Sequence, residues 1–154
     1  METNDTARVA RLMRRVWNAA PQDFVGLGVI VYNGLDELPH LPLKVPAFDA
    51  QFGGVVGEEA VATSLARISA LHSPWHDGFH FVRLSDFRLT HVAQFVSPPI
   101  PVRAGAVTPE RGARHMTATL ASMVNGIALA CVLPTQGEMF FYKNGKRVRM
   151  KEVD

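Results

Sequence analysis

The chain has 154 residues, of which 47% are hydrophobic and 19% are charged, and this composition is typical of one globular domain spanning residues 1–154. Sixteen basic and fourteen acidic side chains leave a net charge of +2. That charge is too close to neutral to drive binding to nucleic-acid phosphates, so no nucleic-acid partner is expected.

The start of the chain and its single cysteine indicate the compartment. The first residues, Met1-Glu2-Thr3-Asn4-Asp5, are polar and do not resemble a signal peptide. No apolar run approaches the roughly 18 residues of a membrane span. Cys131 lies in an apolar run, residues 127–133, which predicts a buried thiol, and one cysteine cannot form an intramolecular disulfide. We therefore expect a cytoplasmic protein with no membrane partner.

The first half of the chain predicts two helices and a buried strand. Apolar residues recur at steps of three and four between residues 4 and 19, which favours an amphipathic helix. Residues 24–32 form an almost continuous apolar run that ends at Asn33-Gly34, as a buried strand does before a turn. Three prolines predict a winding loop over residues 35–56, with short strands near residues 41–43 and 55–56. A second helix is expected over residues 57–71.

The second half predicts a hairpin, a helix and a meander. Residues 79–84 and 88–95 form two strands joined by Ser85-Asp86-Phe87. Thr108-Pro109-Glu110 has the cap, proline and acid that begin a helix. The expected buried stripe of that helix is Ala113, Met116, Leu120 and Met123. Three short strands follow from residue 127. The predicted fold class is therefore α/β (α+β), a mixed central β-sheet flanked by helices.

The turn at residues 72–80 gathers one carboxylate and three imidazoles. Gly78 would let backbone approach a ligand, and Asp77 could bind a hard cation or accept a proton, although a plain turn has the same sequence. His72, His76 and His80 recur every four residues, and this spacing suggests the hypothesis of a zinc site in a metal-dependent hydrolase. Pro74 and Gly78 interrupt any helix between them, so the three rings are not expected on one face.

A second stretch, Arg111-Gly112-Ala113-Arg114-His115-Met116, falls in the first turns of the helix expected after residue 108. Unpaired N–H groups and the helix dipole attract anions there, and guanidinium groups add bidentate phosphate contacts. Solvated arginines at an ordinary helix start are the alternative. The chemistry favours an anion site.

Together the two stretches resemble a known family. Ser73-Pro74-Trp75-His76-Asp77-Gly78-Phe79 resembles the Ser-Pro-Leu-His-Asp-Gly-Ala motif of diadenylate cyclase (DAC) domains, the N-terminal nucleotide-binding module of DNA-integrity scanning proteins. Gly112-Ala113-Arg114-His115-Met116 resembles that family's Gly-Thr-Arg-His-Arg motif, in the same order along the chain. The resemblance covers about residues 57–146.

The resemblance implies a fold, a ligand and a site. In this family two subunits face each other and condense two ATP molecules into cyclic di-AMP with Mg²⁺ or Mn²⁺. Asp77 would hold the metal and activate the ribose hydroxyl as the catalytic residue. The nucleotide-binding residues implied or suggested by the two stretches are His76, Asp77, Gly78, Phe79, Arg111, Gly112, Ala113, Arg114 and His115. A homodimer or higher homo-oligomer, and an effector protein that reads the signal, are the expected partners.

Four departures from the family pattern bear on catalysis. The motif alanine is Phe79, the threonine is Ala113 and the last arginine is Met116. An acidic segment of the family is replaced by Leu133-Pro134-Thr135-Gln136, which has no carboxylate. These changes remove a hydroxyl and charges from the phosphate region, which weakens the case for ATP condensation more than the case for binding.

The sequence therefore favours a divergent DAC-like domain that binds an adenine nucleotide or a nucleotide-derived signal as a sensor, with little or no cyclase activity. The first alternative is an active diadenylate cyclase that supplies the missing groups from Arg103, Glu110 or Arg111. A metal-dependent hydrolase and an interaction module without a small ligand also stay open.

Overall fold

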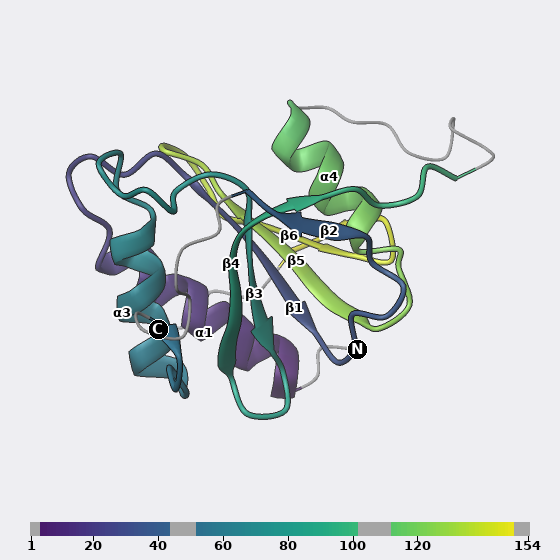
Figure 1. Cartoon of the computed structure of the whole chain (residues 1–154), viewed down its shortest axis with the longest axis horizontal. Helices are drawn as coiled ribbons and strands as arrows, with labels where there is room; N and C mark the ends of the chain where they lie inside the picture. Colours follow the sequence, from purple (N-terminus) through teal and green to yellow (C-terminus); the bar gives the residue numbers. More distant parts are fainter. Residues whose placement is uncertain (1–3, 44–51, 102–111, 150–154) are drawn as a thin grey trace.

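The computed structural model describes residues 4–43, 52–101 and 112–149, and these residues build a seven-stranded mixed sheet flanked by helices (Figure 1). The strand order is β2-β4-β3-β1-β5-β6-β7. The strands are β1 (Leu27–Tyr32), β2 (His40–Pro42), β3 (Phe79–Arg83), β4 (Arg88–Val96), β5 (Ile127–Leu133), β6 (Phe140–Lys143) and β7 (Lys146–Val148). The predicted α+β class with a mixed central sheet is confirmed.

β1 is the central strand, and its pairing defines the end of the sheet where the candidate site lies. β1 runs parallel to β3 and antiparallel to β5, whereas all other neighbours are antiparallel. Gly28 pairs with Phe79 on one side and with Val132 on the other. The starts of β1 and β3 therefore meet the end of β5. All six residues of β1 are buried, as expected for the apolar run from which it forms.

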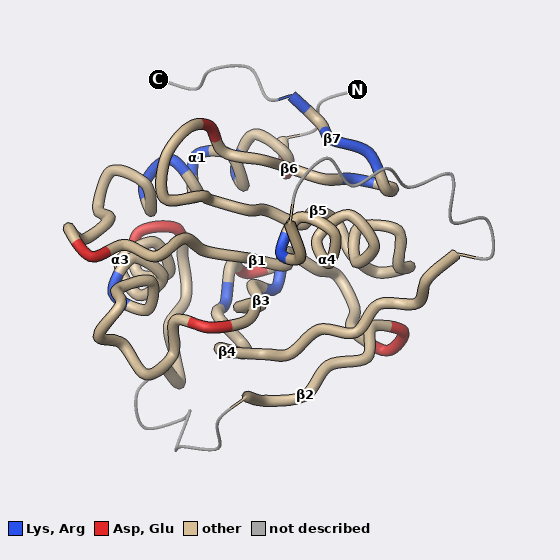
Figure 2. Tube along the Cα trace, turned by 90° about the horizontal axis from the view of Figure 1, so that it is seen from above, with Lys and Arg blue, Asp and Glu red and all other residues tan. Residues whose placement is uncertain are grey.

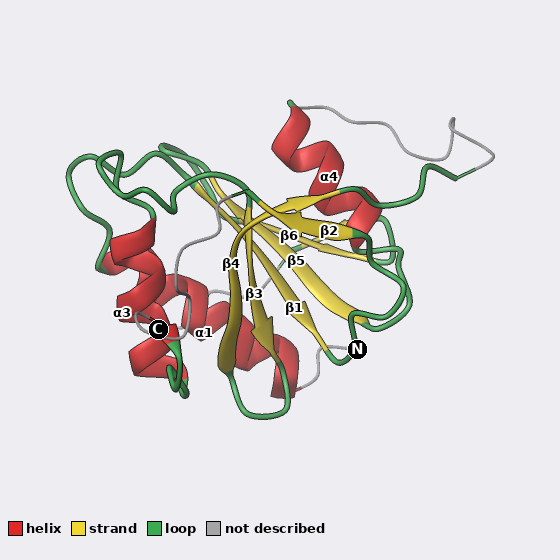
Figure 3. Ribbon diagram, viewed as in Figure 1, coloured by secondary structure: helices red, strands yellow, loops and turns green. Residues whose placement is uncertain are grey.

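Helices cover both faces of the sheet (Figures 2 and 3). The helices α1 (Asn4–Asn18) and α3 (Glu58–Ile68) lie on one face, and α4 (Ala113–Ala121) lies on the other. α1 and α3 match the helices predicted near residues 4–19 and 57–71. An ion pair of 2.7 Å between Arg15 Nε and Glu58 Oε2 joins α1 to α3. No helix within the described ranges is long and apolar enough to cross a membrane.

Each face has its own hydrophobic core. Leu12 of α1 and Leu65 of α3 pack against Val29 of β1 on the first face. On the second face, Ala118 of α4 belongs to a cluster with Ile30, whose side chain alternates with that of Val29. Because successive side chains of a strand point to opposite faces, one apolar strand supplies both cores. This explains the continuous apolar run of β1.

The buried side of α4 differs from the predicted stripe. The buried residues are Ala118, Leu120 and Ala121, so only Leu120 of the predicted set is buried. Met123 is 44% exposed and lies against Gly145 of the final hairpin. The two small alanines face the sheet because the helix packs close to it. The spacing of large apolar residues in the sequence does not reveal such close packing. The predicted cap, Thr108-Pro109-Glu110, lies outside the described residues.

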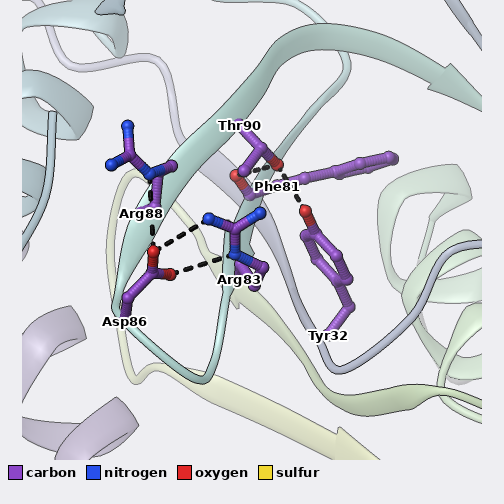
Figure 4. A network of polar contacts seen from close by, with 6 residues as sticks. All are labelled: Tyr32, Phe81, Arg83, Asp86, Arg88 and Thr90. Atoms are coloured by element: carbon purple, nitrogen blue, oxygen red, sulfur yellow. Dashed lines mark hydrogen bonds and ion pairs between the residues drawn. The ribbon is translucent and has the colours of Figure 1, made fainter. Parts of the chain in front are cut away.

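The hairpin of β3 and β4 is closed by a charged turn (Figure 4). The Asp86 carboxylate accepts hydrogen bonds from Arg83 at 2.8 and 3.1 Å and from Arg88 at 3.4 Å. These bonds lower the pKa of Asp86 to about 2, and the Arg83 contact contributes most. Next to it, the hydroxyls of Tyr32 and Thr90 are 2.8 Å apart. The turn thus fixes the end of the sheet opposite the candidate site.

The remaining short strands and bridges agree with those predicted from the sequence. β2 forms in the loop where a short strand was expected near residues 41–43, and Val56 makes an isolated bridge with Arg88. β5, β6 and β7 form the predicted meander. The basic side chains of Lys146 and Arg147 place positive charge along the β7 edge (Figure 2).

Gly28→Ala tests the packing at the start of β1. A Cβ at Gly28 would lie 2.7 Å from the ring of Phe79, so we expect this overpacking to lower the free energy of unfolding by about 1–3 kcal/mol. The same substitution in a Phe79→Ala background should cost less, because the ring is absent. Urea denaturation of all four proteins measures both effects. Gly34→Ala, where no atom lies within 4 Å of the new Cβ, is the matched control. Equal costs in the two backgrounds would contradict this packing.

Candidate functional site

The turn that carries Asp77 is anchored in the first core by Trp75. The indole is only 5% exposed and meets the ring of Phe52 edge-on, with centroids 5.3 Å apart. The Ser73 hydroxyl accepts a hydrogen bond of 3.2 Å from the backbone N–H of Trp75. A buried aromatic residue therefore fixes a turn whose neighbouring side chains are polar.

The three histidines of the turn do not converge. His72 is exposed and lies 2.7 Å from the carboxylate of Asp23, and this hydrogen bond lowers the pKa of Asp23. His76 Nδ1 donates to the Ser73 carbonyl at 2.8 Å, and His80 is fully buried in β3. Among the described residues, no group of three or more His, Cys, Asp or Glu side chains could hold a metal. The hydrolase hypothesis therefore gains no support from the described part of the chain.

Asp77 and Gly78 lie where β3 begins. The Asp77 side chain is 74% exposed, and its Oδ1 lies 3.4 Å from His76 Nε2. Gly78 has φ of 77°, and a Cβ there would lie 2.5 Å from the carbonyl oxygen of Gln94. Glycine is thus required both for its conformation and for its close contact with β4. The result is a carboxylate held outward above the end of the sheet.

Arg114, in the first turn of α4, reaches the same end of the sheet. Its Nη1 would lie 2.6 Å from a Cβ at Gly26, and the Leu133 carbonyl oxygen would lie 3.1 Å from that Cβ. The guanidinium therefore packs over the start of β1 and the end of β5. Burial lowers the pKa of Arg114, and the carboxylate of Asp77 opposes this shift. The structure thus brings Asp77 and Arg114, from the two stretches singled out in the sequence, within electrostatic range.

The start of α4 has the features of an anion-binding helix terminus. Gly112 is the N-cap in an extended conformation, and no side chain among the described residues caps the helix. The first turn contains no acidic residue, and Gly112 and Ala113 are exposed. The backbone N–H groups of this turn are therefore accessible to a ligand. The predicted site residue Arg111 lies outside the described residues.

His115 and Phe79 make contacts within the protein, unlike the exposed carboxylate of Asp77. His115 Nδ1 lies 2.7 Å from the Tyr142 hydroxyl, and its ring meets Phe140 edge-on at 4.7 Å. Phe79 is 5% exposed and its ring covers Gly28. The described conformation thus directs His115 toward β6 and buries Phe79 beneath the site.

His80 is the residue near the site that the sequence analysis did not assign to it. Its Nδ1 accepts a hydrogen bond of 3.0 Å from the buried backbone N–H of Ala93. Its Nε2 is buried and has no hydrogen-bond partner among the described residues. An unpaired buried donor costs about 1–3 kcal/mol. Burial, with smaller effects from Arg114 and His76, lowers the pKa of His80 to about 3.

Comparisons with known proteins support the fold. No protein-family model and no curated protein matches the chain. One similar crystal structure is a hypothetical membrane spanning protein from Bacillus cereus, with a TM-score of 0.63 and 18% identity. That match covers 96% of this chain but 65% of the other, so this chain spans less than two thirds of its length. A double mutant of DacA from Staphylococcus aureus matches with a TM-score of 0.50 and 15% identity, covering 96% of this chain and 89% of DacA. DacA is a diadenylate cyclase, and the fold of this chain is therefore DAC-like.

The buried His80 predicts a loss of stability in mild acid. Its pKa is about 3 in the folded protein against 6.5 as the ordinary value, so below pH 6.5 only the unfolded chain takes up this proton. The free energy of unfolding should fall by about 1.4 kcal/mol per pH unit, or about 2 kcal/mol at pH 5. The effect is absent above pH 6.5 and is complete near the folded pKa of about 3. Urea denaturation between pH 7.5 and 4.5 measures it.

His80→Asn should flatten this pH dependence, because asparagine does not titrate. His91→Asn is the comparison, since partial burial and the neighbouring His40 lower the pKa of His91 in the same direction. We expect the larger change from His80, which is fully buried. An unchanged slope in His80→Asn would contradict the assignment.

Proposed function

We propose that this chain is a DAC-like domain that binds an adenine nucleotide, or a signal derived from one, between the turn at residues 72–79 and the start of α4. It acts as a sensor with little or no cyclase activity. The observation that carries the proposal is that Asp77 and Arg114 approach the same end of the sheet, where burial lowers the pKa of Arg114 and the carboxylate of Asp77 raises it. A carboxylate and a guanidinium at one site are the groups needed for a metal-bound polyphosphate.

The two sides of the site have complementary chemistry. Mg²⁺ and Mn²⁺ prefer oxygen ligands and are commonly held by one or two carboxylates together with substrate phosphates. The exposed carboxylate of Asp77 suits that role. Arg114 and the uncapped N–H groups of α4 suit the phosphates. The missing side chain at Gly26 lets the guanidinium of Arg114 lie over the start of β1, because a Cβ there would be 2.6 Å from Nη1.

The same region lacks groups that phosphoryl transfer uses. Catalysis of this reaction depends on positioning and on neutralising the charge that develops in the transition state. Met116 is half-buried and uncharged where the family motif has an arginine, and Ala113 is exposed without a hydroxyl. His115 is held by Tyr142 and Phe140. The groups that remain therefore suffice for binding, whereas condensation would also need the charge and the hydroxyl that are missing at Met116 and Ala113.

Active diadenylate cyclase is the second candidate. The exposed position of Asp77 opposite Arg114 favours it, since the proposed metal ligand is accessible. A second copy of the chain would have to bring another ATP to the first. Incubation with ATP and Mn²⁺, followed by detection of cyclic di-AMP, separates the two candidates. Multiple turnovers that Asp77→Asn abolishes would establish the enzyme and contradict the sensor.

Calorimetric titration with ATP and Mn²⁺ tests binding itself. Arg114→Gln should raise the Kd of ATP by about tenfold or more, because a charge-assisted hydrogen bond contributes about 1.5–3 kcal/mol. Asp77→Asn should remove the part of the affinity that depends on Mn²⁺. Arg67→Gln on α3 and the exposed Asp36→Asn are matched controls and should leave the Kd unchanged. Absence of ATP binding by the unmodified protein, or equal losses in the controls, would contradict the proposal.

A further inference from the structure

The pairing of β3 with β4 shifts its register twice, and each shift adds one residue to β4. At the first shift Thr90 is the extra residue, and His91 pairs with Phe81. At the second shift Ala93 has φ of 52°, in the left-handed region that alanine rarely adopts, and Gln94 follows it. Bulges redirect the side chains of a strand, and backbone strain of this kind gathers at functional sites.

Both bulges turn polar side chains toward the face of the sheet on which α4 lies. Because side chains alternate along a strand, each extra residue reverses the alternation, and His91 and Gln94 thereby lie on the same face as Phe81. His40 of β2 joins them, with its ring centroid 5.1 Å from that of His91 and 4.9 Å from that of Phe81. α4 packs mainly on β1, β5 and β6, and both histidines are only half-buried.

Gln94 fixes the chemical form of the His40 ring. Its Nε2 donates to the carbonyl of Val92 at 3.0 Å, and this directs its Oε1 to His40 Nδ1 at 2.9 Å. Because an amide oxygen only accepts hydrogen bonds, Nδ1 of His40 carries a proton. The neutral ring of His40 therefore presents a lone pair at Nε2.

Thr90 holds the ring of His91 in a similar way. Its Oγ1 lies 2.9 Å from His91 Nδ1, and the Tyr32 hydroxyl lies 2.8 Å from the same oxygen (Figure 4). The Thr90 hydroxyl can donate to the Phe81 carbonyl at 3.4 Å, so its oxygen can accept from His91. Burial, with a smaller effect from His40, lowers the pKa of His91 and favours a neutral ring at pH 7.

The two Nε2 atoms are left for a ligand. Neither has a hydrogen-bond partner within the described ranges, and neither is a buried unpaired atom, so both reach the surface. Neutral imidazole is a preferred ligand of Zn²⁺, Cu²⁺ and Ni²⁺. A histidine that binds a metal usually forms a hydrogen bond from its other ring nitrogen to a fixed oxygen, as Nδ1 of both rings can do here.

The spacing of the two rings suits one shared ion. Two imidazoles that bind a tetrahedral ion through Nε2 at about 2.0–2.1 Å have ring centres about 5 Å apart. The centroids of His40 and His91 are 5.1 Å apart. Since no group of three or more His, Cys, Asp or Glu side chains forms among the described residues, water would fill the remaining positions.

We propose that His40 and His91 form a binding site for one divalent d-block cation such as Zn²⁺ or Cu²⁺, and that each ring binds it through Nε2. This site is separate from the oxygen-bound Mg²⁺ or Mn²⁺ proposed at Asp77, and it does not rest on nucleotide binding. It also explains the two bulges of β4. They place one ligand, His91, and the residue that orients the other ligand, Gln94, on the same face as His40.

Calorimetric titration of the EDTA-treated protein with ZnCl2 at pH 7.4 tests the site. We expect one Zn²⁺ per chain. His40→Gln or His91→Gln should raise the Kd by about tenfold or more, because each removes one of the two ligands and the loss of an outer partner alone has an effect of this size. His72→Gln is the matched control, since its imidazole is exposed beside Asp23, and it should leave the Kd unchanged.

Two further substitutions test the orientation of the rings. Gln94→Leu and Thr90→Val remove the hydrogen bond to Nδ1 while both imidazoles stay, and each should raise the Kd of Zn²⁺ by about tenfold. Thr119→Val on α4 removes a hydroxyl that bonds only within its own helix, and it should leave the Kd unchanged. Thermal melting followed by circular dichroism shows that each variant is folded.

Electron paramagnetic resonance of the Cu²⁺ complex counts nitrogen ligands in the unmodified protein, so this result does not depend on how a variant folds. We expect two imidazole nitrogens, and one in His40→Gln. The site is overturned if the unmodified protein binds neither ion or if its Cu²⁺ has fewer than two nitrogen ligands. It is also overturned if His40→Gln and His91→Gln keep the original Kd, or if His72→Gln raises the Kd as much as they do.

Discussion

The candidate site depends on the absence of side chains at the start of β1. At Gly28 the ring of Phe79 occupies the space that a Cβ would need, and at Gly26 the guanidinium of Arg114 does so. The first contact lets α4 and its apolar cluster pack on the sheet, and the second brings a cation from α4 to the strand ends. Because Asp77 acts on the same guanidinium, this packing also sets the charge arrangement of the site.

Much of the fold follows from local patterns, and much of the site does not. Local patterns predict β1, α1, α3 and the final meander, because each of these elements depends on a pattern within its own residues: an apolar run, a helical periodicity or a turn. The buried alanines of α4 were missed, since close helix–sheet contact depends on tertiary packing. The approach of Asp77 and Arg114 to the same end of the sheet was expected only from the resemblance to DAC domains. The burial of His80 was not predicted, because a lone histidine in a strand carries no signal of what it will face.

The structure also suggests how a DAC-like fold could bind without catalysing. The groups proposed to hold a ligand, Asp77, Arg114 and the N-terminus of α4, lie at the ends of strands and helices, where packing fixes them. Residues that would neutralise developing charge come from side chains that can change without altering the core, as at Ala113 and Met116. Binding can therefore persist while catalysis is lost, since the two depend on different residues.

The central claim is that nucleotide binds at the end of the sheet where β1 and β3 begin. Mapping of backbone amide shifts by NMR during titration with ATP and Mg²⁺ tests this without assuming the site. The account predicts that the largest shifts occur at Gly26, Gly78 and Arg114. Shifts concentrated instead at the opposite end, around the depression of about 310 Å³ lined by Asn33 and Lys143, would contradict it.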